Sequence, residues 1–414
     1  MLGSISGAKR VSTVDRKMSN SETRVTARRK KRLERKNRNL KRFAIVLAFV
    51  LLLYGVTLWL GPSALGKFSL LGGKTPAVVG PTQDPEPSIP GESLSALEQE
   101  RVQRIRELAE RPNELGKVPI IMYHVIGEPE SEWVRTPQNF RNDLERFYRL
   151  GYSLVPLQAY LSGKMDVPEG ATPLVLTFDD STVGQFRLVD GNYTHSLGKE
   201  DLPEGKMPDP DCAVGILLEF SREHPDFGHA ATFFADFPAP FDVPDEVEEK
   251  LNFLIACGME VGNHTYNHKN LGDVSSDILR MEIGKQSNSV FKITGIKPLS
   301  LALPYGTYPK DKQVRKYLLE GEFEGVSYEN RGVLLVGAEA ALSPYHKVFD
   351  PTAIPRIRGS EEEMSKWLKY LDDSGTRYIS DGSLDTISFP EDRKENVADD
   401  LPDSYDVVVI PIEK

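Results

Sequence analysis

Two adjacent acids and two spaced histidines are the residues of this sequence whose types and spacing could do chemistry. Asp179 and Asp180 close the apolar run PLVLTFDD, and His264 and His268 are separated by Thr-Tyr-Asn. One helical turn would bring both imidazoles to the same side, within reach of a single cation. One carboxylate and two imidazoles leave an open coordination position, which a hydrolytic metal needs. The neighbouring carboxylate is then free to take a proton from the attacking water.

Each part of this pattern also has a simpler structural explanation. A bare His-x-x-x-His is found in surface or capping histidines, and an acidic pair after a strand can cap the next helix. Residues 265–267 contain no Glu between the histidines, so a peptidase of the thermolysin type is disfavoured. The chain has only two cysteines, which excludes a Cys-rich zinc scaffold. Cys212 and Cys257 either pair outside the cell or remain buried free thiols.

The elements that must position these side chains begin after Gly116. Short apolar runs alternate there with amphipathic helical patterns, which predicts an α/β fold with a mostly parallel sheet. In such folds, functional groups gather where strands end and loops begin. The acidic pair and the histidines both follow predicted strands. The predicted strands cover 118–126, 173–180, 231–237, 259–264, 299–305, 325–328 and 354–357, and predicted helices cover 136–150 and 360–371.

Four motifs in order give the sequence a family resemblance. Thr-Phe-Asp-Asp (177–180), Ala-Thr-Phe-Phe (231–234), His-x-x-x-His (264–268) and Leu-Pro-Tyr-Gly (303–306) resemble those of the polysaccharide deacetylases, the family-four carbohydrate esterases with a NodB-type domain. The resemblance covers about residues 117–385. It implies a distorted (β/α) barrel and metal-dependent removal of N-acetyl groups from an amino-sugar polymer.

The resemblance also implies a role for each matching residue. Asp179 looks like the general base, while Asp180, His264 and His268 look like the ligands of a divalent metal, usually zinc. The backbone N–H of Tyr305 would join the metal in stabilising the oxyanion of the tetrahedral intermediate.

The proton donor and the partner of the base need separate consideration. In most members the acid histidine comes late in the chain, where His346 is the candidate. The run Ile-Ile-Met-Tyr before His124 instead resembles a permuted branch, which includes poly-β-1,6-N-acetylglucosamine deacetylases, and His124 is therefore assigned as the acid. No Arg precedes Pro304, although many members have one there. Arg356 is the replacement candidate, as a charge-assisted partner that lowers the pKa of Asp179.

The sequence of the amino-terminal part predicts a membrane anchor. Residues 43–60 form an uncharged apolar run of 18 residues, about the minimum for a ~30 Å hydrocarbon layer. Residues 1–42 are strongly basic, so the positive-inside rule predicts a cytoplasmic amino terminus and an extracellular body. A cleavable signal peptide is the competing interpretation. Residues 61–115 read as a Pro/Gly-rich linker with a stalk helix, 116–390 as the catalytic domain, and 391–414 as an acidic tail.

Charge narrows the choice of function. The chain carries a net charge of −10, and residues 1–42 hold 15 Lys and Arg against three acids, which leaves −22 on the remainder. A body this acidic repels phosphate backbones, so nucleic acid is not an expected partner. The leading hypothesis is a single-pass cell-membrane deacetylase acting on peptidoglycan or a secreted polysaccharide. The alternatives are a non-catalytic glycan-binding protein on the same barrel, or an O-acetyl esterase.

Overall fold

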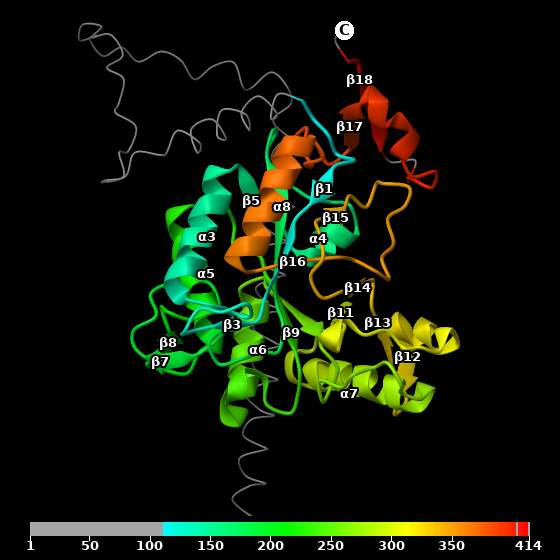
Figure 1. The fold of residues 1–414 in the computed structure, drawn as a ribbon. Helices are drawn as coiled ribbons and strands as arrows, with labels where there is room; N and C mark the ends of the chain where they lie inside the picture. Colours follow the sequence, from blue (N-terminus) through cyan, green and yellow to red (C-terminus); the bar gives the residue numbers. More distant parts are fainter. Residues whose placement is uncertain (1–110, 403–404, 413–414) are drawn as a thin grey trace, which may run out of the picture. The chain divides into compact units, whose positions relative to one another are not determined.

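A curled parallel sheet forms the centre of the fold (Figure 1). The computed structural model describes residues 111–402 and 405–412. The strands follow the order β14-β11-β10-β9-β6-β2-β16, with β5 also paired to β6, and every pairing in this sheet is parallel. Their bounds are β2 Ile120–Tyr123, β5 Tyr152–Leu154, β6 Thr172–Phe178, β9 Thr232–Ala235, β10 Glu260–Asn263, β11 Ser300–Ala302, β14 Gly332–Leu334 and β16 Ile357–Arg358.

The two ends of this strand order meet through the segment that leads into β16. Leu334 of β14 forms a parallel bridge with Ile354, and the Leu335 N–H donates to the Ile354 carbonyl at 2.8 Å. The sheet thus curls toward a barrel, as the motifs predicted. Five of its strands, β2, β6, β9, β11 and β14, are fully buried, because side chains fill the inside and helices cover the outside.

Helices surround the outside of the sheet in Figure 1. The two helices expected from periodicity are present as α3 and α8, and Thr136 caps α3 by accepting the N–H of Asn139. The apolar stripes of α3, α5, α6 and α8 pack with strand residues in one hydrophobic cluster. The helices are α3 Pro137–Arg149, α4 Leu157–Leu161, α5 Ala213–Glu223, α6 Val247–Ala256, α7 Ser276–Thr294 and α8 Glu361–Ser374.

One predicted strand is misplaced. The run 325–328 was expected in the parallel sheet, but β13 (Val326–Glu329) forms an antiparallel hairpin with β12 (Glu320–Phe323). The sheet strand is β14, whose Gly332 has no room for a side chain because a Cβ would lie 2.7 Å from Leu161. Three residues with a leading glycine give little strand signal, so the hairpin was the stronger pattern.

Short two-stranded pairs extend the periphery. The tail predicted for 391–414 contains β18, which pairs in parallel with β17, so an edge strand forms there. The first predicted strand, 118–126, is divided into three pieces, and His124 lies between the second and third. These peripheral strands are β1 Lys117–Val118, β3 Val125–Ile126, β4 Val134–Arg135, β7 Leu188–Asp190, β8 Lys206–Pro208, β15 Ala341–Leu342, β17 Thr386–Pro390 and β18 Asp406–Ile410.

The predicted membrane segment lies outside the described residues. The basic segment 1–42, the apolar run 43–60 and the linker up to residue 110 all precede the first described residue. Among the described helices, none is both long and apolar enough to cross a bilayer. Both cysteines are described, and Cys212 and Cys257 are buried free thiols rather than a disulfide.

Candidate metal centre

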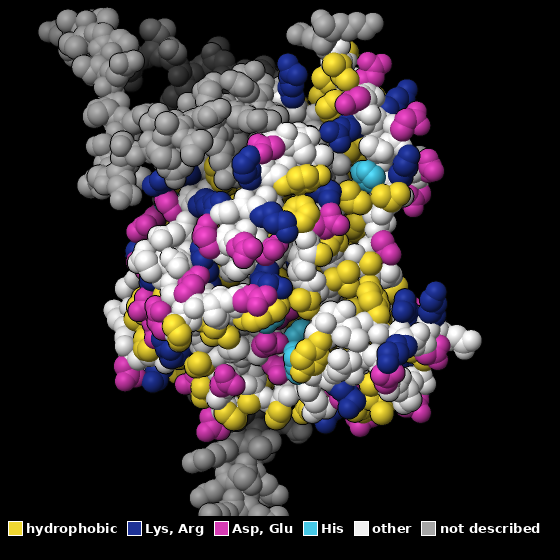
Figure 2. All heavy atoms as spheres, in the orientation of Figure 1, with side chains coloured by type: hydrophobic (Ala, Val, Ile, Leu, Met, Phe, Trp, Pro, Cys, Tyr) yellow, Lys and Arg dark blue, Asp and Glu magenta, His cyan; other side chains and the backbone are white. Residues whose placement is uncertain are grey.

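Asp180, His264 and His268 meet at the carboxyl ends of two strands of the parallel sheet. Asp180 follows β6 and the histidines follow β10, with β9 between these two strands. The Nε2 atoms of both histidines lie 3.1 Å from Asp180 Oδ1. One ligand atom from each residue lies within 4.8 Å of the others, which is close enough to surround a cation. In Figure 2, histidine side chains reach the surface beside acidic and hydrophobic groups.

The histidine pair lies on a loop, not on the helical turn that its spacing suggested. The imidazole centroids are 4.9 Å apart, and residues 264–268 have no helical assignment. Thr265 and His268 have positive φ angles of 63° and 48°. The Asn263 side chain accepts the Thr265 N–H at 2.9 Å, and Thr265 Oγ1 accepts the Lys269 N–H at 3.1 Å. The loop therefore reaches the geometry that a helix was expected to supply.

The donor atoms fit a divalent cation. His264 Nδ1 lies 2.9 Å from the Ala302 carbonyl, which only accepts, so Nδ1 carries the proton and Nε2 presents its lone pair toward Asp180. With Nδ1 protonated in the neutral imidazole, the Nε2 lone pair faces a carboxylate oxygen at 3.1 Å, an arrangement that either a second proton on Nε2 or a cation bound between the two atoms stabilises. Two imidazoles and a carboxylate suit zinc and other first-row divalent metals, and three ligands leave coordination positions for substrate and water.

Electrostatics around the triad agree with this fit. Burial would raise the pKa of Asp180, but the adjacent imidazoles of His264 and His268 outweigh burial and hold this pKa well below its usual range. Burial would lower the pKa of His264, but Asp179 and Asp180 raise it above its ordinary value. The site is thus arranged to keep its carboxylates ionised and to attract positive charge.

Asp179 forms a buried ion pair with Arg356. The Asp179 side chain is 1% exposed and that of Arg356 is 0% exposed. The guanidinium donates a hydrogen bond to each carboxylate oxygen, at 2.8 and 2.7 Å. Arg356 Nε also donates to the Leu335 carbonyl at 2.8 Å, which fixes the plane of the guanidinium. Burial would raise the pKa of Asp179, but the charge of Arg356 lowers it below its ordinary value. The carboxylate is therefore anionic and held beside the triad.

His124 follows β2 and lies at the same edge of the sheet. Its ring packs edge-to-face on Trp133, with centroids 4.7 Å apart, and Arg358 lies 4.2 Å from the centroid of the indole. Burial lowers the pKa of His124, against the opposing charges of Asp179 and Asp180.

The alternative acid, His346, lies in different surroundings. It pairs with Val397 of the carboxyl-terminal segment through an antiparallel bridge. After burial, the groups that lower its pKa are Lys347, Arg393 and Lys117, and none of these belongs to the triad. The geometry therefore favours His124 over His346 as the histidine of this site.

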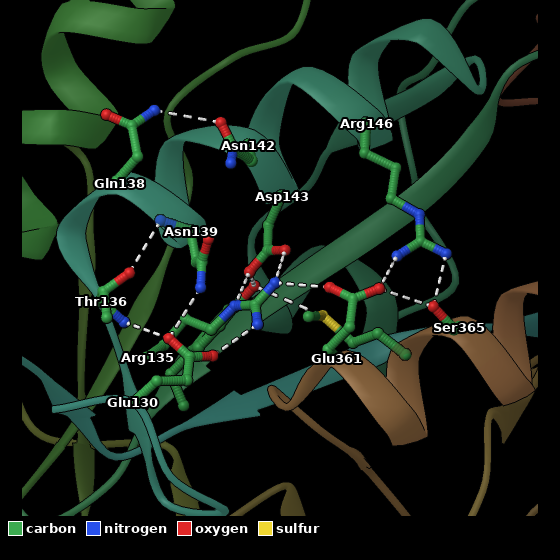
Figure 3. Close-up of polar contacts among 12 residues, drawn as sticks. Glu130, Arg135, Thr136, Gln138, Asn139, Asn142, Asp143, Arg146, Glu361 and Ser365 are labelled. Atoms are coloured by element: carbon green, nitrogen blue, oxygen red, sulfur yellow. Dashed lines mark hydrogen bonds and ion pairs between the residues drawn. The ribbon is translucent and has the colours of Figure 1, made fainter. Parts of the chain in front are cut away.

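Ion pairs fix the loop that carries Trp133, as Figure 3 shows. Arg135 donates to both oxygens of Asp143 on α3, at 2.8 and 2.6 Å, and to Glu130 at 2.6 Å. It also reaches Glu361 on α8 at 2.8 Å. The Tyr123 hydroxyl donates to Asp143 at 2.9 Å. One network of hydrogen bonds thus joins helices α3 and α8, the end of β2 and the loop that carries Trp133.

Tyr305 borders the triad on the other side. Its ring is 64% exposed and packs edge-to-face on His268, with centroids 4.8 Å apart. Tyr305 and Gly306 both have positive φ, 58° and 61°, and a Cβ on Gly306 would lie 3.1 Å from Val336. This tight turn, η4 (Pro304–Gly306), carries the backbone of Tyr305 beside the ligands.

Backbone strain concentrates at this edge of the sheet. Of the eight non-glycine residues with positive φ in the described chain, five belong to the loops of the site. Such conformations cost about 1–3 kcal/mol each and persist only where surrounding contacts hold them. These five residues are Asp180, Ser181, Thr265, His268 and Tyr305.

Several residues of the site escaped the sequence analysis. Buried Gln185 donates from its amide to the carbonyls of both His124 and Asp179, which ties the two loops together. Trp133 and Glu282 were also missed, because a single Trp before a strand and a Glu within a helix are ordinary in themselves.

Comparisons with known proteins give one family match and several similar solved structures. Residues 226–320 match the family model described as polysaccharide deacetylase. None of the curated proteins compared with the chain matches its sequence. Similar solved structures include a Streptococcus pyogenes deacetylase, PplD, in complex with acetate, which is 18% identical with a TM-score of 0.43, over 61% of this chain and 97% of that one.

Two further similar structures are IcaB and BpsB. IcaB from Ammonifex degensii is 15% identical with a TM-score of 0.39, over 61% of this chain and 97% of that one. The BpsB deacetylase domain from Bordetella bronchiseptica is 14% identical with a TM-score of 0.37, over 60% and 97%. The family match itself covers the loops that carry His264, His268 and Tyr305. Residues 226–320 of the chain are therefore similar to the polysaccharide deacetylase family.

Proposed function

We propose that the chain is a metal-dependent deacetylase that hydrolyses N-acetyl groups on an amino-sugar polymer, either peptidoglycan or an exopolysaccharide. One observation carries the proposal: the Asp180–His264–His268 triad lies beside a buried anion, Asp179, that Arg356 holds in place. A binding module would need neither the cation site nor the paired base. The family match supplies the substrate class.

The residues of the site divide the reaction between them. A divalent cation on the triad would polarise the acetyl carbonyl and acidify water. Asp179 accepts the proton of the attacking water, and Arg356 holds the carboxylate in position. The Tyr305 N–H stabilises the oxyanion. Attack of the water forms the C–O bond and gives the tetrahedral intermediate. The C–N bond would then break as the protonated form of His124 donates its proton to the leaving amine, while Asp179 holds the proton taken from water, and the products are acetate and a free amino sugar.

Release of acetate by the full-length protein tests this proposal. The substrates are chitin oligomers, β-1,6-linked N-acetylglucosamine oligomers and peptidoglycan, each with and without chelator. We expect activity on at least one substrate, lost with chelator and restored by zinc. Activity that survives complete metal removal would contradict the mechanism. Acetate release only from O-acetylated sugars would make the protein an esterase.

Variants separate the roles of the residues. Asp179→Asn should abolish turnover while leaving metal binding intact, whereas His264→Ala should lose both. His124→Ala should slow turnover, with His346→Ala as its matched control. If only His346→Ala slows catalysis, the assignment of the acid is wrong.

The proposed location is the outer face of the cell membrane, with residues 43–60 as the anchor and residues 1–42 in the cytoplasm. The support is the uncharged run and the basic segment before it. Protease added to intact cells should digest the body and leave a small membrane-bound amino-terminal fragment. Recovery of the protein in the medium, cleaved after residue 60, would show a signal peptide instead.

A further inference from the structure

Glu282 of α7 is a buried acid that holds the loop between the two histidines. Its side chain is 2% exposed. Oε2 accepts the N–H groups of Tyr266 at 3.1 Å and Asn267 at 2.9 Å, and Oε1 accepts from the Asn267 side-chain amide at 2.8 Å. All three bonds end on residues that lie between His264 and His268. A carboxylate that accepts several N–H groups makes stronger bonds than a neutral acceptor does.

The loop depends on such support from outside. Thr265 and His268 adopt left-handed backbone conformations, which are unfavourable for residues with side chains. A helical turn would maintain its own hydrogen bonds, but this loop has no helical ladder. The direction in which His268 points is therefore set by the groups that hold its neighbours.

The same helix also holds the loop through an aromatic side chain. Lys285 Nζ lies 3.8 Å from the centroid of the Tyr266 ring, and Phe237 stacks on this ring with centroids 5.8 Å apart. One turn further along, the Gln286 amide donates to the carbonyls of Ala235 and Gly262, near the ends of β9 and β10. Helix α7 thus joins the loop to the strands beneath it, and Glu282 is its polar contact with the loop backbone.

We propose that Glu282 is a positioning residue that sets the affinity of the triad for its cation. It fixes the Tyr266 and Asn267 amides so that His268 Nε2 stays 3.1 Å from Asp180 Oδ1. Partners behind metal ligands commonly control affinity in this way, because a ligand that must be ordered on binding weakens the complex. The inference rests on the metal site of the proposed function.

Zinc titration of the metal-free full-length protein tests the role of Glu282. Glu282→Ala should lower zinc affinity by about 10- to 100-fold, the usual range for such partners. Its cobalt form should show weaker visible absorption, because His268 no longer completes the coordination. Glu282→Gln should retain most of the affinity, since its amide oxygen still accepts both backbone N–H groups and only the bond from the Asn267 side chain is lost.

Glu260→Ala is the matched control. Glu260 lies at the opposite end of β10, where it accepts the Gln158 N–H at 3.0 Å and the Thr232 hydroxyl at 3.1 Å. Its loss should lower thermal stability without changing zinc affinity. Wild-type affinity in Glu282→Ala, or equal losses in Glu260→Ala, would overturn the inference. If the wild type binds zinc but releases no acetate, the proposed function fails while the effect of Glu282 on affinity stands.

Discussion

Replacing Arg356 with Met tests whether Asp179 is held as a buried anion. Met is similar in length but has no charge and no donor. The variant leaves the Asp179 carboxylate, 1% exposed, without its guanidinium, and it removes the donor to the Leu335 carbonyl. Removing one partner of a buried ion pair costs about 3–5 kcal/mol, because the remaining charge is uncompensated. We expect a loss of unfolding free energy in that range.

A double-mutant cycle isolates the pair. Asp179→Asn leaves the guanidinium without its counter-charge, so it should also be destabilising. The double variant carries no buried charge at this position, and we expect it to lose about 3 kcal/mol less than the sum of the single losses. Urea unfolding of the full-length protein in detergent, followed by circular dichroism with chelator present, measures each free energy.

Arg377→Met is the control. Arg377 is 1% exposed and pairs with Asp372 at 3.2 Å, so its loss should also destabilise the fold. It should leave acetate release per folded molecule unchanged, whereas Arg356→Met should nearly abolish it. Single losses below about 1 kcal/mol, or strictly additive losses, would refute the view that Asp179 is a paired anion.

Three further outcomes are expected. Burial raises the pKa of Glu114 from 4.5 to about 7, so the contribution of the protonated Glu114 to stability is full below pH 4.5 and is lost as the pH rises through 7. As the pH is raised from 4.5 to 8, the free energy of unfolding of Glu114→Gln, measured in urea, should therefore increase by about 3 kcal/mol relative to that of the wild type. Trp133→Ala removes the ring that packs on His124 and should lower kcat about tenfold or more, with a smaller change in KM. Trp133→Phe should retain most activity. A change in KM alone would contradict the view that Trp133 positions His124. Because Cys212 and Cys257 are free and buried, reductant should not shift the urea midpoint, and two thiols should titrate after denaturation.

The sequence by itself determined which residues could form a cation site and where they stand along the chain. Asp179 and Asp180 follow the apolar run that forms β6, and His264 directly follows β10. Parallel strands place their carboxyl ends at one edge of a sheet, so local pattern and this general rule together predicted that the side chains would meet. The motifs also predicted the family whose model matches residues 226–320.

The tertiary structure decided everything that depends on the order and curl of the strands. The contact between Arg356 and Asp179 spans 177 positions and exists because β16 and β6 both flank β2. The packing of Trp133 on His124 and the bonds of Glu282 to the histidine loop likewise join separate elements. Periodicity indicates which face of an element is apolar, but not which other element packs against that face. The spacing of His264 and His268 likewise could not distinguish a helical turn from a loop held by hydrogen bonds from outside. The candidate ligands can therefore be predicted from the sequence, whereas the contacts that hold them in place form only when the strands assemble into the curled sheet.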